Sequence, residues 1–218
     1  MNLEQSRYNM IEQQIRPWNV LNQTILDLLA RIPRDAFVPE AYRKLAYVDT
    51  EIPLGHGEFM MPPRVEARML QDLAINHDDS CLEIGTGSAY VTACLASLSQ
   101  HVDSVDLYSD FTKSAEQKLQ QHKRNNVELM TKDVSQGWKL AKPQYDVIAI
   151  TASMPTYHPS FENLLKPKGR LFVIIGKAPA MAATLITRSQ KGDITRTTLF
   201  ETVINPLVGK KEQQPFVF

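Results

Sequence analysis

The chain has 218 residues, of which 43% are hydrophobic and 22% are charged, a composition typical of a folded globular protein and incompatible with global disorder. Lysine plus arginine and aspartate plus glutamate number 24 each, so no net charge attracts the chain to nucleic acid or to an anionic membrane. Its N-terminus lacks the apolar core of a signal peptide, and no apolar run approaches the roughly 18 residues of a membrane span. We therefore expect a protein that binds neither nucleic acid nor membrane.

The first 62 residues predict a helical cap followed by a loop. Residues 3–16 and 21–31 are expected to form helices, because their apolar residues recur at helical spacing and a proline follows each segment. Residues 47–63 contain two glycines and three prolines with little periodicity, which predicts a loop. A further helix is expected at 64–75, directly after this loop.

From residue 80 onward, short apolar runs alternate with amphipathic segments. Strands that are apolar throughout are buried on both faces, so this rhythm predicts an α/β fold with a doubly wound, mostly parallel sheet. The strands are expected at 81–84, 101–107, 127–131, 145–150 and 170–175, and the helices at 88–99, 110–124 and 157–166.

The sequence after residue 180 predicts a C-terminal β-hairpin. Two strands are expected at 183–189 and 196–204 with a turn and no helix between them, which favours an antiparallel pair that closes the sheet. Residues 1–62 are therefore interpreted as the cap and cover loop. Residues 64–218 are interpreted as a Rossmann-like body that folds with the cap as a single domain.

Cys81 and Cys94 are the two cysteines of the chain. Their number and spacing fit neither a disulfide framework nor a metal site. Both fall in segments predicted to be buried, which indicates small core residues in a reducing compartment. We therefore expect a cytoplasmic protein without a bound metal.

A glycine-rich turn follows the first predicted strand. Gly85 and Gly87 allow the backbone to turn sharply and to approach a ligand closely, although a tight turn without a ligand would use the same residues. A dinucleotide fingerprint requires a third glycine where Tyr90 stands, so a nicotinamide oxidoreductase is disfavoured. The Glu83 carboxylate, two residues before the turn, suits the cationic end of a ligand better than a pyrophosphate.

Polar residues follow the next predicted strands at the same edge of the sheet. Asp106 lies 21 residues beyond Gly85, where an acid is expected to bind ribose hydroxyls. Asp133 could accept from an adenine amine, with the Val134 backbone nearby, and Thr151 ends the fourth strand at the expected edge of the cleft. A solvated strand-end acid is the alternative for each carboxylate, but the shared register favours a single ligand site.

Motifs along nearly the whole chain resemble those of the protein-L-isoaspartate (D-aspartate) O-methyltransferases. The resemblance implies a class I methyltransferase fold that binds S-adenosyl-L-methionine, releases S-adenosyl-L-homocysteine and methylates the carboxylate of isoaspartyl residues in damaged proteins or peptides. It rests on residues 33–39, 46–49, 52–55, 57, 83–90, 165–171 and 205–209.

The resemblance and the strand-end positions together give the expected cofactor contacts. The resemblance also implies that residues 53–63 cover the methyl donor and the acceptor carboxylate. His56, in that loop, is expected to touch the substrate, with simple exposure as the alternative. The expected cofactor contacts are Glu83, Gly85, Thr86, Gly87, Ser88, Tyr90, Asp106, Leu107, Asp133, Val134 and Thr151.

One departure from the family pattern concerns the chemistry itself. Met61 stands where family members usually carry a serine whose hydroxyl lies near the transferring methyl group. An acceptor carboxylate is ionised at pH 7 and needs no general base, so catalysis depends mainly on alignment in a dry pocket. Methionine cannot donate the hydrogen bond that serine would give.

Three hypotheses remain open from the sequence. The chain methylates isoaspartyl residues, methylates a different carboxylate or small molecule, or binds the cofactor without catalysis. The sequence also leaves the oligomeric state open.

Overall fold

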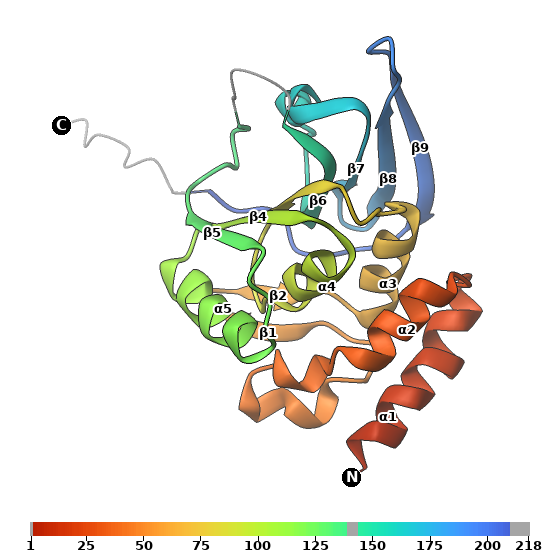
Figure 1. Cartoon of the computed structure of the whole chain (residues 1–218), viewed down its shortest axis with the longest axis vertical. Helices are drawn as coiled ribbons and strands as arrows, with labels where there is room; N and C mark the ends of the chain where they lie inside the picture. The colour runs from red at the N-terminus through yellow and green to blue at the C-terminus, as the bar shows by residue number, and fades with distance from the viewer. Residues whose placement is uncertain (1, 139–143, 210–218) are drawn as a thin grey trace, which may run out of the picture.

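A seven-stranded sheet forms the centre of the fold (Figure 1). The computed structural model describes residues 2–138 and 144–209. The strands lie in the order β5-β4-β3-β6-β7-β8-β9, parallel from β5 to β7 and antiparallel from β7 to β9. The predicted α/β sheet with its C-terminal hairpin is therefore confirmed. The bounds are β3 Ser80–Ile84, β4 His101–Asp106, β5 Val127–Thr131, β6 Tyr145–Met154, β7 Leu165–Lys177, β8 Ala180–Arg188 and β9 Ile194–Glu201.

The chain reverses its direction across the sheet between β3 and β6. It runs outward from β3 through β4 to β5, and then returns to place β6 on the other side of β3. In open α/β sheets, ligands bind outside the carboxyl ends of the strands at such a switch point. The topology therefore predicts a ligand site among the residues that follow β3, β4 and β6.

The helices differ from the prediction mainly at their ends. The predicted helix at 157–166 is a short 3-10 helix with Pro159 in its first turn, and β7 begins directly after it. None of the described helices is long and apolar enough to span a membrane. The bounds are α1 Leu3–Met10, α2 Gln23–Arg31, α3 Pro63–Asp72, α4 Tyr90–Leu98 and α5 Ser109–Gln121, with a π-helix at Ile11–Ile15 and 3-10 helices at Arg16–Trp18, Arg34–Ala36, Glu40–Leu45 and Pro159–Leu164.

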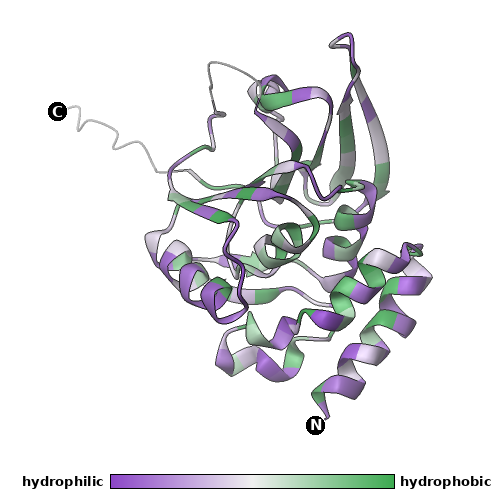
Figure 2. Ribbon diagram, in the orientation of Figure 1, coloured by the Kyte–Doolittle hydropathy of each residue, from purple (hydrophilic) through white to green (hydrophobic). Residues whose placement is uncertain are grey.

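Helix α5 shows why the amphipathic segments form the layers around the sheet. Phe111, Ala115 and Leu119 recur every four residues and are buried, so they share the face of the helix that contacts the protein interior. The outer face is largely hydrophilic (Figure 2). Cys81 and Cys94 are buried free thiols, as expected for small core residues.

Residues predicted to form only a loop contain a second, two-stranded sheet. Strand β1 (Ile52–Gly55) pairs antiparallel with β2 (Glu58–Met60), and we name residues 52–60 the lid. The prediction of a loop was wrong here because each strand is very short and has little periodicity. Gly55, His56 and Gly57 all have positive φ and form the tight turn between the strands.

A buried ion pair joins the cap to the body and to Met61, directly after the lid. The guanidinium of Arg34, which is only 1% exposed, donates from Nε to Glu66 Oε2 on α3 over 3.1 Å. Its Nη2 donates to the carbonyl oxygen of Met61 over 2.5 Å. One hydrophobic cluster also contains side chains from both the cap and the body, among them Leu28 and Leu95.

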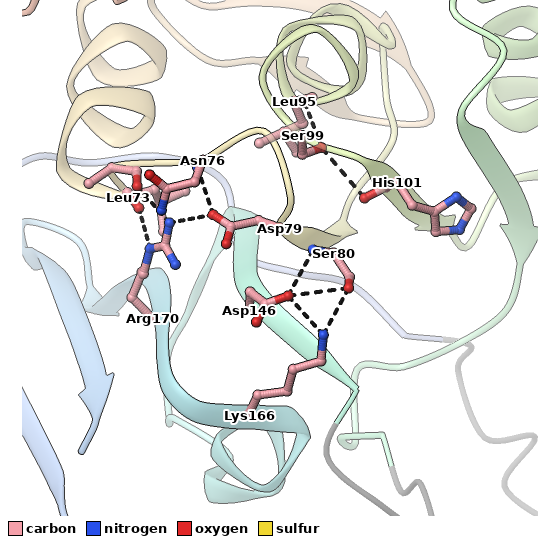
Figure 3. Close-up of polar contacts among 11 residues, drawn as sticks. Leu73, Asn76, Asp79, Ser80, Leu95, Ser99, His101, Asp146, Lys166 and Arg170 are labelled. Atoms are coloured by element: carbon pink, nitrogen blue, oxygen red, sulfur yellow. Dashed lines mark hydrogen bonds and ion pairs between the residues drawn. The ribbon is translucent and has the colours of Figure 1, made fainter. Parts of the chain in front are cut away.

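A polar network supports the opposite end of the sheet from the lid (Figure 3). Arg170 on β7 donates to the carbonyl oxygen of Leu73, to that of Ala74 and to the Asp79 carboxylate, over 2.6, 2.6 and 2.5 Å. These carbonyls lie just beyond the end of α3, where backbone acceptors have no partner within the helix. Arg170 therefore attaches the end of α3 to the sheet.

We expect Arg170→Ala to lower the free energy of unfolding by about 3 kcal/mol. The change would leave the Asp79 carboxylate, whose side chain is 12% exposed, without its cation and would remove two carbonyl partners. Urea denaturation measures the loss. Arg16→Ala is the matched control, because Arg16 and its partner Glu12 are 37% and 35% exposed, so its loss should stay below about 1 kcal/mol. Equal losses would contradict this role of Arg170.

Candidate active site

A cleft opens at the carboxyl ends of β3, β4 and β6, at the switch point of the sheet. The lid covers it on one side, and the segment 204–208, which follows β9, contributes Asn205 and Leu207 to its wall. Seven of the residues predicted from the sequence line this cleft together: Met61, Gly85, Gly87, Asp106, Leu107, Val134 and Thr151.

Gly85 occupies a position that only glycine fits. Its φ is +99°, and a Cβ atom placed there would lie 2.3 Å from Thr151 Oγ1. The Thr151 hydroxyl lies within hydrogen-bonding distance of the carbonyl oxygens of Ile84 and Gly85, at 3.0 and 2.7 Å. The end of β6 therefore fixes the turn after β3, and the missing side chain leaves room for this contact.

Asp106 holds the same turn from the other side. Its Oδ2 accepts from the Gly87 N–H over 2.8 Å, and its Oδ1 accepts from the Tyr108 N–H over 3.0 Å. Burial raises the pKa of this carboxyl, and these N–H donors oppose the rise. Because a carboxylate oxygen can accept more than one hydrogen bond, Asp106 can still accept from a ligand hydroxyl at the cleft.

Glu83 is fully buried behind the turn. Its Oε2 accepts from Thr92 Oγ1 over 2.5 Å and from Ser104 Oγ over 2.6 Å, and Thr86 Oγ1 lies 2.7 Å from Ser104 Oγ. Within the described part of the chain, Glu83 Oε1 has no hydrogen-bond partner. Burial raises the pKa of this carboxyl to about 8, although the two hydroxyls oppose the rise.

A smaller cavity, which we name the inner pocket, lies beside the cleft and shares some of its walls. Met61, Gly85, Gly87 and Thr151 line both spaces. Three further predicted residues, Glu83, Thr86 and Ser88, line only the inner pocket, with Met60 and Glu66. The two spaces together bring ten predicted positions to the switch point.

Three predicted site residues lie elsewhere. Tyr90 is buried in the core, where its ring meets that of Phe37 at 5.7 Å, so it does not line the cleft. Asp133 lines a neighbouring groove, and its Oδ1 accepts from the Ser135 N–H over 2.9 Å. The sequence alone does not show that these side chains face away from the cleft, because the direction of a side chain near a strand end depends on the turn that follows.

His56, the third, forms a latch outside the cleft. Its ring stacks on that of Tyr108 with centroids 4.0 Å apart and planes 5° apart. Its Nε2 lies 2.8 Å from Asp110 Oδ2 on α5, and this hydrogen bond lowers the pKa of the Asp110 carboxyl. Asn205 Nδ2 also donates to the carbonyl oxygen of Gly57 over 2.8 Å. These contacts hold the lid against both α5 and the segment 204–208.

We expect His56→Ala to loosen the lid. Loss of the stacked ring and of the bond to Asp110 should remove about 1 kcal/mol from lid closure, and so raise amide exchange at residues 55–61 about 5-fold. Hydrogen exchange with and without S-adenosylhomocysteine measures this, and we expect the ligand to slow the exchange in both proteins. His77→Ala is the matched control, because His77 is 92% exposed and contacts its neighbour Asp78. Equal exchange in the two variants would refute the latch.

The sequence missed residues that close the site. Asn205 and Leu207 after β9 line the cleft but were given no role, and Leu54 and Glu58 were included only as part of the segment 53–63 expected to cover the cofactor. Residues 205–209 contributed to the family resemblance, which was the available signal. The segment 204–208 is held at the cleft by a backbone hydrogen bond, in which the Ser153 N–H near the end of β6 donates to the Asn205 carbonyl oxygen over 2.8 Å.

Comparison with known sequences identifies the family. The sequence profile described as protein-L-isoaspartate(D-aspartate) O-methyltransferase (PCMT) matches residues 5–212. The protein-L-isoaspartate O-methyltransferase of Protochlamydia amoebophila is 34% identical over 208 residues, which cover 94% of this chain and 98% of that protein. The protein of the same name from Koribacter versatilis is 31% identical over 209 residues, which cover 96% of this chain and 93% of its own.

Comparison with solved structures agrees at the level of the fold. A candidate protein-L-isoaspartate O-methyltransferase of Plasmodium falciparum, crystallised with S-adenosyl-L-homocysteine, superposes with a TM-score of 0.79 over 95% of this chain and 99% of that one, at 19% identity. A second structure, of a protein-L-isoaspartate O-methyltransferase, gives a TM-score of 0.77 at 21% identity and covers 93% of this chain. At these identities the likeness shows the fold alone. With the profile match and the sequence relatives, however, the chain is shown to belong to the protein-L-isoaspartate(D-aspartate) O-methyltransferase family.

Proposed function

We propose that this protein transfers a methyl group from S-adenosylmethionine to the carboxylate of isoaspartyl residues in damaged proteins and peptides. The observation that carries the proposal is the buried oxygen of Glu83 that has no hydrogen-bond partner among the described residues, beside the glycine turn at the switch point of the sheet. Family membership supports the same activity, because the relatives described above bear the name of this enzyme.

The residues present fit the chemical groups of that cofactor. The Glu83 carboxyl suits an ammonium group, and Asp106 suits a pair of ribose hydroxyls. Gly85 and Gly87 line both the cleft and the inner pocket, so no side chain of the turn stands between its backbone and a ligand there. The other residues we assign to the cofactor site are Thr86, Gly87, Ser88, Leu107, Val134 and Thr151.

When bound, the cofactor supplies an electrophilic methyl group on a sulfonium ion. The protein contributes position and dryness rather than proton transfer, because the acceptor carboxylate is already ionised at pH 7. The lid and the segment 204–208 exclude water from the reacting atoms. Met61, only 4% exposed and lining both the cleft and the inner pocket, is proposed to pack beside the methyl group.

One observation favours a second candidate function. The side chain at position 61 is a buried thioether that cannot donate to a carboxylate, so the acceptor could be a different carboxylate or a small molecule. Labelled S-adenosylmethionine, incubated with an isoaspartyl peptide and with its normal aspartyl twin, separates the candidates. Label on the isoaspartyl peptide alone supports the first. Tight cofactor binding with no label on either peptide supports a changed acceptor or lapsed catalysis.

We further propose that the cap and body fold as one domain and that the protein works in the cytoplasm. The buried Arg34–Glu66 pair and the shared hydrophobic cluster support the first statement. The free, buried thiols of Cys81 and Cys94 are compatible with a reducing compartment.

A further inference from the structure

The inner pocket places Glu83 among other acidic groups. Asp106 on β4 and Glu66 on α3 both act on Glu83 in the direction that disfavours a second negative charge, and Glu83 acts in the same direction on the Cys94 thiol on α4. The nearby cation, Arg34, is already committed to Glu66 through Nε and Nη2. Within the described residues, no cation forms an ion pair with Glu83.

The hydrogen bonds around Glu83 distinguish its two oxygens. Oε2 accepts from the hydroxyls of Thr92 and Ser104. Since Ser104 has one proton and gives it to Glu83, the Thr86 hydroxyl must donate to Ser104. The hydroxyls of Thr86, Thr92 and Ser104 are then all used on the Oε2 side, and the fully buried Oε1 receives no donor among the described residues.

An ionised carboxylate with one bare oxygen, no cation and two acidic neighbours is unfavourable in a buried site. We propose that Glu83 carries a proton on Oε1 in the free protein and releases it to solvent when the ammonium group of the cofactor binds against that oxygen. In this exchange the O–H bond of Glu83 breaks, the proton leaves to water, and the ammonium charge neutralises the carboxylate. The inference rests on the proposed function, because it requires a cofactor with an ammonium group.

The direction of the pH dependence follows from the two states of Glu83. In the free protein, burial raises the pKa of this carboxyl to about 8. In the complex the bound ammonium lowers that pKa, so below about pH 8 each binding event releases a proton and becomes more favourable as pH rises. We expect Kd for S-adenosylhomocysteine to fall about 10-fold per pH unit between about pH 6 and 7.5 and to level off above about pH 8.

Calorimetry tests the release directly. S-adenosylhomocysteine is titrated into the full-length protein at pH 7 in buffers with different ionisation enthalpies, and the slope of observed heat against buffer enthalpy gives the number of protons. We expect about one proton released by the wild type, and none when adenosine, which lacks the ammonium group, is titrated instead. Glu83→Gln should bind S-adenosylhomocysteine more weakly and release no proton. Glu40→Gln, a change to a carboxylate that is 88% exposed and lies outside the cleft, should keep the release.

The outcomes separate this inference from the proposed function. S-adenosylhomocysteine binding without proton release, or release that persists in Glu83→Gln, overturns the inference and leaves the function standing. Release lost in Glu66→Gln but kept in Glu83→Gln would assign the proton to Glu66 and also overturn it. Absence of any S-adenosylhomocysteine binding would instead refute the proposed function. If Glu83→Gln does not fold, the wild-type pH series and the adenosine comparison still decide.

Discussion

Gly85→Ala is expected to weaken the binding of S-adenosylhomocysteine about 100-fold. The new Cβ would lie 2.3 Å from Thr151 Oγ1, on a backbone whose φ of +99° is unfavourable for any side chain. The strained turn and the displaced Thr151 hydroxyl disturb the backbone that lines the cleft. We expect the binding free energy to be less favourable by about 3 kcal/mol, which corresponds to about 100-fold in Kd. Calorimetric titration of the folded variant measures the loss.

Two companion variants identify the cause. Gly57→Ala introduces the same methyl group at a positive φ with nothing within 4 Å, so it reports strain without a clash. The double variant Gly85→Ala, Thr151→Ala removes the clashing hydroxyl and should bind S-adenosylhomocysteine more tightly than Gly85→Ala alone. If Thr151→Ala weakens binding equally in both backgrounds, the contact between these two residues is not the reason that position 85 is glycine.

Met61→Ser is expected to raise kcat/KM on an isoaspartyl peptide by roughly 10- to 150-fold. A serine hydroxyl donating to the acceptor carboxylate is worth about 1.5–3 kcal/mol if the bond is felt in the transition state. The same change removes a buried thioether, so the free energy of unfolding should fall by about 1–3 kcal/mol while activity rises. Steady-state kinetics and urea denaturation give the two quantities, with cofactor affinity measured separately.

Met61→Ala distinguishes the effect of the serine hydroxyl from the effect of a smaller side chain. Alanine relieves crowding but donates nothing, so a gain confined to serine assigns the effect to the hydrogen bond. A gain shared by both variants assigns it to bulk. A wild-type protein already as fast as serine-bearing relatives, with no gain in Met61→Ser, would show that the hydroxyl is dispensable in this chain.

The central sheet was predictable because its strands carry their signal locally. Runs such as 81–84 and 145–150 are mainly apolar, with one acid each, and do not alternate with polar residues, so burial on both faces is expected from the local sequence. The lid was not predictable in this way. Its strands are three and four residues long and gain stability from His56 against Tyr108 and from Asn205 against Gly57, contacts between distant segments.

The site was predictable where backbone geometry imposes a residue type. Gly85 is required by its φ and by the approach of Thr151, and Asp106 by the N–H groups that it accepts. The protonation of Glu83, by contrast, depends on which hydroxyls surround it and on the distance to other acids, and no local pattern records this. The place of Tyr90 in the core was not predictable either, because its position in the glycine turn says nothing about Phe37, its partner from the cap.

The lid has a consequence for the order in which the protein matures. The lid comes from residues 52–60, and the cleft that it covers is formed by later strands. Asn205, which donates to the Gly57 carbonyl oxygen of the lid, lies 148 residues beyond Gly57. On a growing chain, the earlier segments can begin to fold while this clasp is still unsynthesised. Contacts of such long sequence separation also form slowly, because the intervening loop must close first. The lid can therefore be held in place over the cleft only after residue 205 has been synthesised.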